Sequence, residues 1–497
     1  MSHPRAINPV AALDALAPLR AAVAERCEPA EIASTYLVGG VVRDALIDRP
    51  LLDLDIATSA DPESLARSLA RAVDGTAFPL GDDFGCWRVA VTHDHSAEAP
   101  DPRLDTIHQI DVCALVGGMI SSDLAHRDLT LNALAVPVAG APTILDEHHG
   151  IDDLERGMVR MVAASGFDDD PLRMLRVARI AHVLDLDIDP ATVAAVRARA
   201  ARACEPAGER IFAELTLLLT HPESRRGWRL LEELGIDAVL LPELDSCRGI
   251  AQSRFHHLDV HDHTLAVLDN CEDVLGAHGF WLPLPDEPGL RDSVALDDEQ
   301  RLAIILAALC HDLGKPGTRA LRPDGRVSFV GHDVTGRAIV DDIADRWRWS
   351  NALRLRVRTL VGTHLALGFL LHGPRDLRSR WHWLRDIAPV APEAVILSVG
   401  DRLATAGPDD RRRWVRAHLE IARAVWSDHW REVRDGLPTP LLDGAELIVL
   451  ADIAPGPRVG ELVRALAEAQ AVGEVQSRVD AEDLVRQLVN GSTAPRP

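Results

Sequence analysis

The pattern of apolar and polar positions changes once along the 497-residue chain, close to residue 150. Before that point, short β-branched stretches with alternating character predict strands at 34–38, 88–92 and 108–115. After it, apolar residues recur at helical spacing, as at 172, 175, 177, 180 and 183. The pattern therefore predicts a mixed α/β region that is followed by a helical remainder.

The stretch LLDLDIATS (51–59) places two aspartates in an otherwise apolar strand. Residues two apart in a strand point to the same face, so we expect Asp53 and Asp55 to point together. The same alternation directs Leu52, Leu54 and Ile56 to the opposite face. Burying one carboxylate is unfavourable unless it is paired, hydrogen-bonded or metal-bound, and burying two is worse. The pair indicates either a metal site or, more simply, two exposed acids at a strand edge.

A glycine turn precedes this strand, between the expected strand at 34–38 and a helix that starts within 41–47. Glycines there let a phosphate approach the backbone, and Arg43 is placed to bind it. A plain tight turn is the simpler interpretation. Asp111 lies in a further expected strand and can complete a group of three carboxylates. Three carboxylates that hold two Mg²⁺ ions suit nucleotidyl transfer.

Composition narrows the classes of protein that fit. A chain of this length, 47 % hydrophobic, is expected to form three or four domains. Its longest clean apolar run, at 302–310, is half of the ~18 residues that a membrane span requires. The N-terminus has no apolar core of a signal peptide. The seven cysteines include no C-x-x-C pair, which predicts a reduced, cytoplasmic protein without a disulfide framework or a cysteine-based zinc site.

The net charge of −23 requires any RNA-binding site to be a local arginine patch. Apart from Lys315, the chain has no lysine. One candidate patch is 409–435, which carries seven Arg and three Trp on a helical pattern and could grip RNA and stack a base. An amphipathic helix with Trp inside and Arg outside explains the same residues.

Five ordered motifs resemble those of the class II tRNA nucleotidyltransferases and bacterial poly(A) polymerases. They are YLVGGVVRDALIDRPLLDLDIAT (36–58), DLAHRDLTLNALA (123–135), LDEHHGIDDLERGMVRMV (145–162), DDDPLRMLRVARIA (168–181) and RRGWRLLEELGIDAVLLPEL (225–244). The resemblance implies an α+β chain with a polymerase-beta-like nucleotidyltransferase head and an all-α neck, body and tail. The expected domains are the head at 1–150, the neck at 151–245, an HD domain at 246–405 and the tail at 406–497.

The resemblance also assigns roles to residues. Asp53 and Asp55 would be Mg²⁺ ligands, with Asp111 as the third catalytic acid. The implied nucleotide-binding residues are Gly40 and Arg43 at the phosphates, Arg127, Asp128 and Asn132 at the ribose and triphosphate, and Asp170 and Arg173 at the base edge of CTP or ATP, with Arg176 and Arg179 on the same helix face. An arginine fork beside a carboxylate suits a Watson–Crick edge. A solvated helix with i,i+3 ion pairs is the alternative for 168–181.

The chain departs from the family pattern at several positions. The family usually has Glu at Asp169, an aromatic residue at Leu129 and Arg at His126. Enzymes that add all of CCA carry a long flexible loop between the third acid and the next motif, but here only 112–122 lies there. This short segment predicts a partial product, either CC or A, unless the polar loop at 93–107 replaces the missing one.

A second group of residues resembles the ligands of the HD phosphohydrolase superfamily. The implied ligands of a divalent transition metal are His263, His311, Asp312 and Asp401, because imidazoles with carboxylates suit such an ion. His332 and His364 are weaker candidates. His256, His257 and His261 are expected at the surface. The implied activity is hydrolysis of a phosphate ester, such as a 2′,3′-cyclic phosphate or a 2′-phosphate.

Three alternatives stay open beside a tRNA nucleotidyltransferase that uses CTP and ATP. They are a poly(A) polymerase, an HD phosphohydrolase with a degenerate head, and a catalytically idle RNA-binding or regulatory protein. The intact Asp53/Asp55 pair argues against the last two. The expected partners are tRNA and CTP or ATP, with no membrane, and the sequence leaves the oligomeric state open.

Overall fold

The computed structural model describes residues 7–29, 31–80, 85–91, 101–252, 257–276, 282, 296–405 and 412–491. The chain forms two compact units, which are treated separately below. The N-terminal unit comprises residues 1–218 and 226–240, and the helical unit comprises 219–225 and 241–497. Among the described residues, none of the helices has the length and apolar character needed to cross a bilayer.

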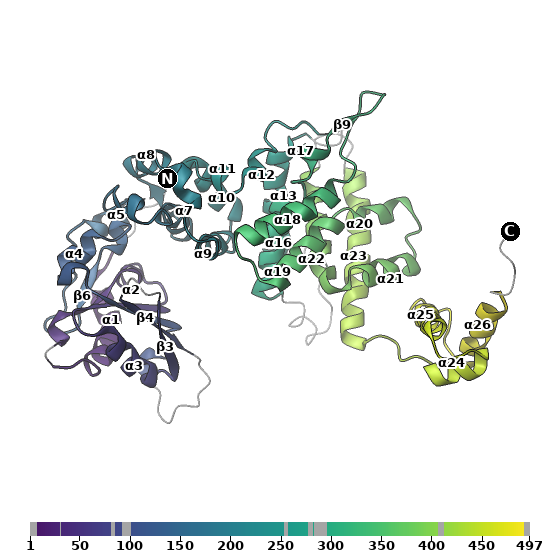
Figure 1. The fold of residues 1–497 in the computed structure, drawn as a ribbon, viewed down its shortest axis with the longest axis horizontal. Helices are drawn as coiled ribbons and strands as arrows, with labels where there is room; N and C mark the ends of the chain where they lie inside the picture. Colours follow the sequence, from purple (N-terminus) through teal and green to yellow (C-terminus); the bar gives the residue numbers. More distant parts are fainter. Residues whose placement is uncertain are drawn as a thin grey trace. The chain divides into compact units, whose positions relative to one another are not determined.

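A six-stranded mixed sheet forms the centre of the N-terminal unit, in the order β3-β4-β5-β2-β1-β6 (Figure 1). Its strands are β1 (Thr35–Val38), β2 (Asp53–Thr58), β3 (Gly75–Pro79), β4 (Cys86–Val91), β5 (Gln109–Ala114) and β6 (Ala135–Pro137). Strands β2 and β5 run parallel, while the other neighbouring pairs are antiparallel. The expected strands at 34–38, 88–92 and 108–115 are therefore confirmed within one or two residues.

The alternation in β2 is confirmed only inside the strand. Leu54 and Ile56 are buried, as expected. Leu52 is 43 % exposed and precedes the first residue of β2, so it lies outside the alternating part of the strand. Part of the core beside the sheet is formed by Val38, Ala57, Leu115, Leu124, Ala133 and Ala135.

Helices and a two-stranded ladder complete the N-terminal unit. The α-helices are α1 (Pro9–Ala24), α2 (Gly40–Leu46), α3 (Pro62–Ala72), α4 (Ile120–Ala125), α5 (Gly150–Arg156), α6 (Gly166–Asp169), α7 (Arg173–Val183), α8 (Pro190–Arg197), α9 (Gly208–Leu219), α10 (Ser224–Leu234) and α11 (Asp237–Leu240), of which α9 and α10 reach the boundary between the units. The ladder pairs β7 (Met158–Val159) with β8 (Asp187–Ile188) in parallel. Within this unit, the switch to helical structure near residue 150 is thus confirmed, apart from this short ladder.

The helical unit is almost entirely α-helical (Figure 1). Its α-helices are α12 (Pro242–Asp245), α13 (Val260–Gly276), α16 (Asp298–Cys310), α17 (Lys315–Thr318), α18 (His332–Arg346), α19 (Asn351–Thr363), α20 (Ala366–Phe369), α21 (Leu377–Asp386), α22 (Ala391–Ala404), α23 (Arg412–Asp435), α24 (Gly444–Ala451), α25 (Pro457–Ala471) and α26 (Arg478–Gly491). A hairpin of β9 (Ala320–Leu321) and β10 (Val327–Ser328) follows α17. Helix α16 packs against α13, α19 and α22, and this explains its nearly continuous apolar sequence.

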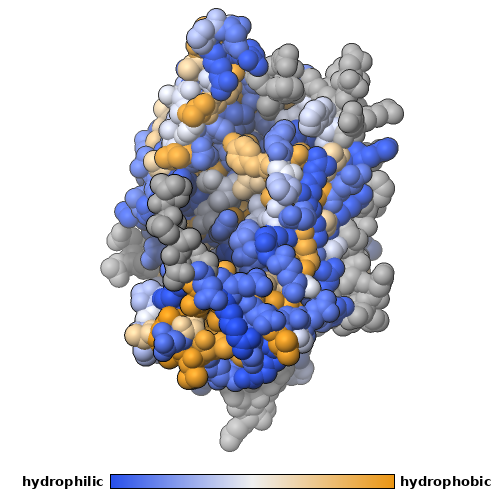
Figure 2. Space-filling model, turned by 90° about the vertical axis from the view of Figure 1, so that its right-hand side faces the viewer, coloured by the Kyte–Doolittle hydropathy of each residue, from blue (hydrophilic) through white to orange (hydrophobic). Residues whose placement is uncertain are grey.

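The last three helices enclose a core of their own. Its buried residues are Leu442, Leu447, Ala451, Leu462, Leu466, Ala469, Val475, Ala481 and Val485. Figure 2 shows a largely hydrophilic face of the molecule on which hydrophobic residues gather mainly in the lower part.

In the arginine- and tryptophan-rich helix α23, Trp426 and Trp430 are buried, whereas Trp414 is 55 % exposed. The interpretation as an amphipathic helix therefore accounts for two of the three tryptophans.

Cys86 and Cys113 form a disulfide across β4 and β5. The expectation of a chain without disulfides is wrong at this pair. The two cysteines are 27 residues apart, and only the strand register sets them directly opposite one another. The other five cysteines are free.

Candidate nucleotidyl-transfer and metal sites

The turn from β1 into α2 lies against the predicted catalytic face. Gly39 has φ +73°, a backbone conformation that glycine adopts without strain. A Cβ at this position would lie 2.9 Å from Nη1 of Arg127 and 3.2 Å from Oδ2 of Asp55. A Cβ on Gly40 would lie 3.5 Å from the guanidinium of Arg43. The turn therefore lets charged side chains approach the backbone closely, as expected for a phosphate cradle.

Strand β2 carries Asp53 and Asp55 beside Asp111 of β5. The parallel register pairs Asp55 directly with Asp111. Burial raises the pKa of Asp55 to about 6, and the nearby positive charge of Arg127 opposes this rise. Burial, and then the charge of Asp111, raises the pKa of Asp53. The three carboxylates thus share one region whose negative charge is only partly neutralised, and a divalent cation would stabilise it.

Asp111 is also the acceptor of an ion pair that the sequence did not reveal. Arg88, opposite it on β4, donates from Nε and Nη2 to its two oxygens at 2.8 and 2.9 Å. Gln109 donates to Asp111 at 3.2 Å. Within the described parts of the chain, the groups whose metal-ligating atoms lie within 4.8 Å of one another are all in the helical unit. The three head carboxylates are therefore neighbours in the sheet, but their oxygens do not all lie within 4.8 Å of one another.

Most of the predicted nucleotide-binding residues belong to one buried polar network. Arg43 donates to Asn132 at 2.6 Å and is held from the other side by Asp44. Asn132 in turn donates to Asp128 at 3.0 Å. Burial alone would raise the pKa of Asp128, but the charge of Arg176 and these hydrogen bonds hold it well below its usual range. Asp128 is therefore an anion that orients its neighbours.

The network continues from Asp128 into helices α7 and α9. Arg176 donates to Asp128 at 2.6 Å and to Glu214 at 3.4 Å. Arg179 donates to the other oxygen of Glu214 at 2.6 Å. The charge of Asp128 raises the pKa of Arg176, so this guanidinium stays charged. Glu214 was missed from the sequence, although it lies in GERIFAEL (208–215), where acids and Arg alternate at helical spacing.

The remaining predicted residues have separate partners. Arg127 donates to Asp123 at 2.9 and 3.1 Å. Asp170 accepts from Arg210 at 2.8 Å and, with its other oxygen, caps the turn that leads into α7. A Cβ on Gly166 would lie 2.7 Å from Nη1 of Arg173, so that glycine leaves room for the guanidinium. Asp170 and Arg173 thus lie close in sequence, but Asp170 is paired with Arg210.

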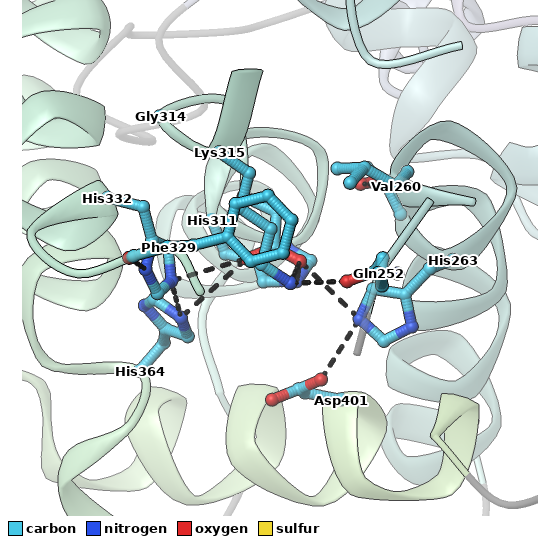
Figure 3. A network of polar contacts seen from close by, with 12 residues as sticks. Gln252, Val260, His263, His311, Gly314, Lys315, Phe329, His332, His364 and Asp401 are labelled. Carbon is cyan, nitrogen blue, oxygen red and sulfur yellow. Dashed lines mark hydrogen bonds and ion pairs between the residues drawn. The ribbon is translucent and has the colours of Figure 1, made fainter. Parts of the chain in front are cut away.

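The second predicted site is a buried cluster in the helical unit (Figure 3). Nε2 of His263, on α13, lies 3.1 Å from Asp401 of α22 and 3.6 Å from Oδ2 of Asp312. Nε2 of His311 lies 3.2 Å from the same oxygen of Asp312. All four predicted ligands therefore converge, although they are spread over 139 positions of the sequence.

Local structure prepares these side chains for a cation. His311 follows the last residue of α16, and its Nδ1 lies 2.9 Å from the carbonyl oxygen of Ala308. This contact directs the buried Nε2 into the cluster, toward Oδ2 of Asp312. The charges of His311 and Lys315 outweigh burial and hold the pKa of Asp312 well below its usual value. A fixed imidazole and an ionised carboxylate are suitable ligands for a divalent metal.

Three further residues complete the surroundings of Asp312. The ammonium of Lys315 lies 2.5 Å from Oδ2 of Asp312 and 2.6 Å from Gln252. His332 and His364 lie on the opposite side, at 3.5 and 4.0 Å from Oδ1. The sequence singled out both histidines only as weaker candidates.

The expectation that three other histidines lie at the surface is partly wrong. His257 is exposed, as expected, and His256 lies outside the described residues. His261 is buried, and its Nδ1 lies 3.2 Å from Asp262. It precedes the buried His263 by two positions on α13.

Comparison with known families divides the chain into three matched segments. A poly A polymerase head domain matches residues 35–160, and a probable RNA and SrmB-binding site of polymerase A matches 185–248. An HD domain matches residues 260–406. The first segment contains the carboxylates of β2, and the third contains the histidine cluster.

Curated proteins and solved structures give the same picture over nearly the whole length. An A-adding tRNA nucleotidyltransferase of Deinococcus radiodurans is 35 % identical over 90 % of this chain and 94 % of its own. A CC-adding tRNA nucleotidyltransferase of Thermus thermophilus is 33 % identical over 90 % of this chain and 92 % of its own. The structure of a CCA-adding enzyme with ATP has a TM-score of 0.61 at 17 % identity, covering 98 % of this chain and 96 % of that one, so it supports the fold.

Proposed function

The chain belongs to the tRNA nucleotidyltransferase family, and on that premise we propose that it adds C, A or both from CTP and ATP to tRNA 3′ ends. The observation that carries the proposal is the adjacency of Asp53, Asp55 and Asp111 beside the glycine turn at Gly39. The action on tRNA is supported by the names of the relatives that cover 90 % of the chain. We further propose the four domains expected from the sequence, and a cytoplasmic location among tRNA and nucleoside triphosphates.

The head residues fit Mg²⁺. Burial raises the pKa of Asp55 to about 6, because the nearby charges of Arg127 and Arg176 offset only part of the cost of burying its carboxylate. Oxygen ligands of this kind are those that Mg²⁺ prefers. Asp53 and Asp55 would hold the ions, and Asp111 would assist. When bound, such ions activate the attacking 3′-hydroxyl and stabilise the leaving pyrophosphate.

The residues around the carboxylates would bind and orient the nucleotide. Arg43 and Arg127 provide positive charge beside the glycine turn, where the triphosphate would lie. Asp128 and Asn132 form the buried support of that charge and are placed to contact the ribose. Arg173, together with Asp170 and Arg210, would read the base edge, since an arginine fork and a carboxylate offer both donors and acceptors. Arg176 and Arg179 are fixed by Glu214 and would keep this arrangement rigid.

We propose a partial product, either CC or A. The segment between Asp111 and Asp123 is short, and after the end of β5 it contains a 3-10 turn (Val116–Gly118) and the start of α4. The relatives named above are partial enzymes by name, one A-adding and one CC-adding. Most of the loop at 93–107, which could substitute for a longer segment, lies outside the described residues.

The experiment uses purified full-length protein, Mg²⁺ and labelled CTP or ATP with three tRNA transcripts. The transcripts lack one, two or three terminal nucleotides. Addition of A only to the transcript ending in CC, or of CC only to the bare transcript, is the expected result. Complete CCA on the bare transcript would contradict the partial product. Long A tails on any transcript would favour the poly(A) polymerase alternative.

A second activity is favoured by the converging ligands in the helical unit. We propose that His263, His311, Asp312 and Asp401 hold a divalent transition metal and that the site hydrolyses a phosphate ester. Imidazole and carboxylate together select ions such as Mn²⁺, Co²⁺, Ni²⁺ or Zn²⁺. Such an ion lowers the pKa of a bound water toward neutrality and so supplies a nucleophile. A cyclic 2′,3′-phosphate or a 2′-phosphate on RNA is the proposed substrate, with an aryl phosphate as a general probe.

A further inference from the structure

A disulfide lies on the face of the sheet that carries the head carboxylates. Cys86 of β4 is bonded to Cys113 of β5. The neighbouring pair on this face, two residues along each strand, is Arg88 with Asp111. The parallel register then pairs Asp111 with Asp55 of β2. The disulfide therefore stands in the row next to the one that contains two of the three carboxylates.

The side chains around the disulfide show that it faces away from helix α3. This helix packs against β3, β4 and β5 (Figure 1). Trp87 of β4 faces the helix, because the guanidinium of Arg67 on α3 lies 5.2 Å from the centre of its ring. Cys86 and Arg88, on either side of Trp87, point to the other face. Cys86 and Cys113 are both half-buried, so a dissolved thiol has access to their bond.

The disulfide closes one end of the paired strands β4 and β5. Cys86 is the first residue of β4, and Cys113 is followed by Ala114, the last residue of β5. The ends of paired strands open more readily than their centres, because fewer interactions hold them. A covalent bond prevents this opening, and Arg88 lies only two residues inside it. The disulfide therefore limits how far Arg88 can move away from Asp111.

Arg88 occupies the oxygens of Asp111 that a metal ion would use. It donates from Nε and Nη2 to both of them, at 2.8 and 2.9 Å. A guanidinium at this distance neutralises the carboxylate and repels a second cation. The affinity of the head for Mg²⁺ therefore depends on how firmly Arg88 is held.

The proposed cytoplasmic location gives this disulfide a meaning beyond stability. Thiols in the cytosol are kept reduced, and the disulfides that form there are usually transient and serve catalysis or redox sensing. The other five cysteines of the chain are free thiols. An accessible disulfide that adjoins a proposed metal-binding carboxylate fits a redox sensor better than it fits a structural cross-link.

We propose that Cys86 and Cys113 form a redox-modification site that sets the Mg²⁺ requirement of nucleotide addition. In the oxidised enzyme the disulfide holds Arg88 on Asp111, so more Mg²⁺ is needed. In the reduced enzyme the end of β4 opens, and Arg88 gives up Asp111 to the metal more readily. The effect on addition rests on the proposed nucleotidyl transfer, whereas the modification site rests on the disulfide and its surroundings.

The site takes low-molecular-weight thiols and their disulfides, such as reduced and oxidised glutathione. A thiolate attacks one sulfur of the Cys86–Cys113 bond, forms a mixed disulfide and releases the other cysteine as a thiolate. A second thiolate attacks the mixed disulfide and releases the remaining cysteine. Both released thiolates take up a proton. The protein thus gains two electrons and two protons, and two small thiols become one small disulfide; oxidation of the protein is the reverse exchange.

The test compares the two redox forms of the full-length protein. The protein is equilibrated with oxidised or with reduced glutathione and desalted, and its free thiols are counted by alkylation and mass spectrometry. Reduction should raise the count from five to seven per chain. Addition of labelled ATP or CTP to tRNA is then measured against Mg²⁺ concentration. The reduced form should reach half-maximal addition at about 2–5-fold less Mg²⁺, with an equal rate at saturation.

A second readout measures metal binding without catalysis. Electron paramagnetic resonance follows Mn²⁺ binding in the His311→Ala/Asp312→Ala background, which lacks the proposed site of the helical unit. The reduced form should bind Mn²⁺ about 2–5-fold more tightly than the oxidised form. Because both forms have the same sequence, a misfolded variant cannot produce this difference.

Three variants trace the effect to its residues. Cys86→Ser/Cys113→Ser should behave like the reduced wild type in both glutathione buffers. Cys204→Ser removes an exposed free cysteine and is the matched control, so it should keep the full redox response. In Arg88→Ala the two redox forms should need equal Mg²⁺, because the group that the disulfide positions has been removed.

The outcomes separate the modification site from the function of the head. A disulfide that reduced glutathione leaves intact would be a structural cross-link, and this would overturn the modification site. A redox response that persists in Arg88→Ala would overturn the role of the ion pair. Reversible thiols with a shift in Mn²⁺ affinity but without nucleotide addition would overturn the proposed function and leave the redox site standing. Nucleotide addition whose Mg²⁺ requirement ignores the thiol count would do the reverse.

Discussion

The two candidate metal sites differ in how their ligands are held before any ion binds. In the head, Asp53 is exposed at the start of β2, and Asp111 is engaged by Arg88. In the helical unit, His311, Asp312 and His364 are buried, and helix carbonyls orient the imidazoles. The first site is only partly assembled, whereas the second is preorganised.

This difference indicates how each site uses its metal. A group of carboxylates that is open at one side suits Mg²⁺, which keeps several waters and binds together with substrate phosphates. A buried set of imidazoles suits a transition ion that stays bound between turnovers. We therefore expect the head to lose its ions on desalting and the helical unit to retain them. The following changes test that contrast.

The largest effect is expected from Asp55→Ala or Asp53→Ala. Each substitution removes a ligand that stabilises the transition state, so kcat for nucleotide addition should fall by about 10³-fold or more, which is roughly 4 kcal/mol. Gel assays of labelled ATP or CTP incorporation at saturating Mg²⁺ measure the loss. Phosphate-ester hydrolysis and the melting temperature should stay unchanged. Near-normal turnover in either variant would show that these carboxylates do not bind the catalytic ions.

The converse change is the double substitution His311→Ala/Asp312→Ala. It should abolish hydrolysis of aryl and cyclic phosphates and remove the retained transition metal, because it deletes two ligands, one of them charged. Nucleotide addition should stay within about threefold of wild type, since the head ligands are untouched. His311→Asn serves as the milder variant. If nucleotide addition is lost in step with folding, the cluster is a scaffold for the helices and not a metal site.

Arg173→Ala should alter nucleotide choice more than overall rate. A site that hydrogen-bonds one base edge rejects another that leaves its polar groups unpaired, and this discrimination should fall by roughly 10–100-fold. Values of kcat/KM for ATP, CTP, GTP and UTP on the preferred tRNA end measure it. Arg199→Ala, which breaks an ion pair with Asp168, is the matched control. An equal loss of rate with all four nucleotides would contradict the base-reading role.

The sequence predicted β1, β2, β4, β5 and the helical character after residue 150, because their apolar periodicity is strong; it did not predict β3, β6 or the two short ladders. It also singled out the four side chains that converge in the helical unit, and the Asp53/Asp55 pair on β2, since each stands in a local motif. It did not predict the partners of Asp111 and Asp170, because strand register and helix packing bring Arg88 and Arg210 to them from a distance. The same limit applies to the Cys86–Cys113 pair and to the carbonyls that orient His332 and His364.

Arg88→Ala tests whether the ion pair of Asp111 limits metal binding in the head, and its expected effect is smaller than those above. Removing the guanidinium releases Asp111 from its ion pair and leaves it only the hydrogen bond from Gln109, so the head carboxylates should bind metal more readily. The Mg²⁺ concentration for half-maximal addition should fall by about 2–5-fold, an effect of roughly 0.4–1 kcal/mol. Arg88→Lys should behave closer to wild type because it keeps the charge. An unchanged or higher Mg²⁺ requirement would mean that Asp111 serves the ion pair and not the metal.

The smallest effect is expected from Glu272. This carboxyl tests whether a pKa raised by burial can occur without metal binding. Burial raises the pKa of this α13 carboxyl to about 7, as burial also raises that of Asp55, but its oxygens accept from the backbone N–H of Ser224 at 2.8 and 2.9 Å. A pKa raised in the folded state contributes stability that is fully present below the unfolded value near 4.5 and is lost as the pH rises toward 7. Partial exposure of the side chain screens the effect, so Glu272→Gln should stabilise the protein at pH 8 by about 1 kcal/mol relative to pH 4.5. Thermal unfolding of both proteins across this range measures the difference, which should level off above pH 7. Added Mn²⁺ should leave the difference unchanged, because the Glu272 carboxyl already accepts from a backbone N–H. A shift that depends on Mn²⁺ would instead place a metal at Glu272, and this carboxyl could then no longer serve as the metal-free control for Asp55.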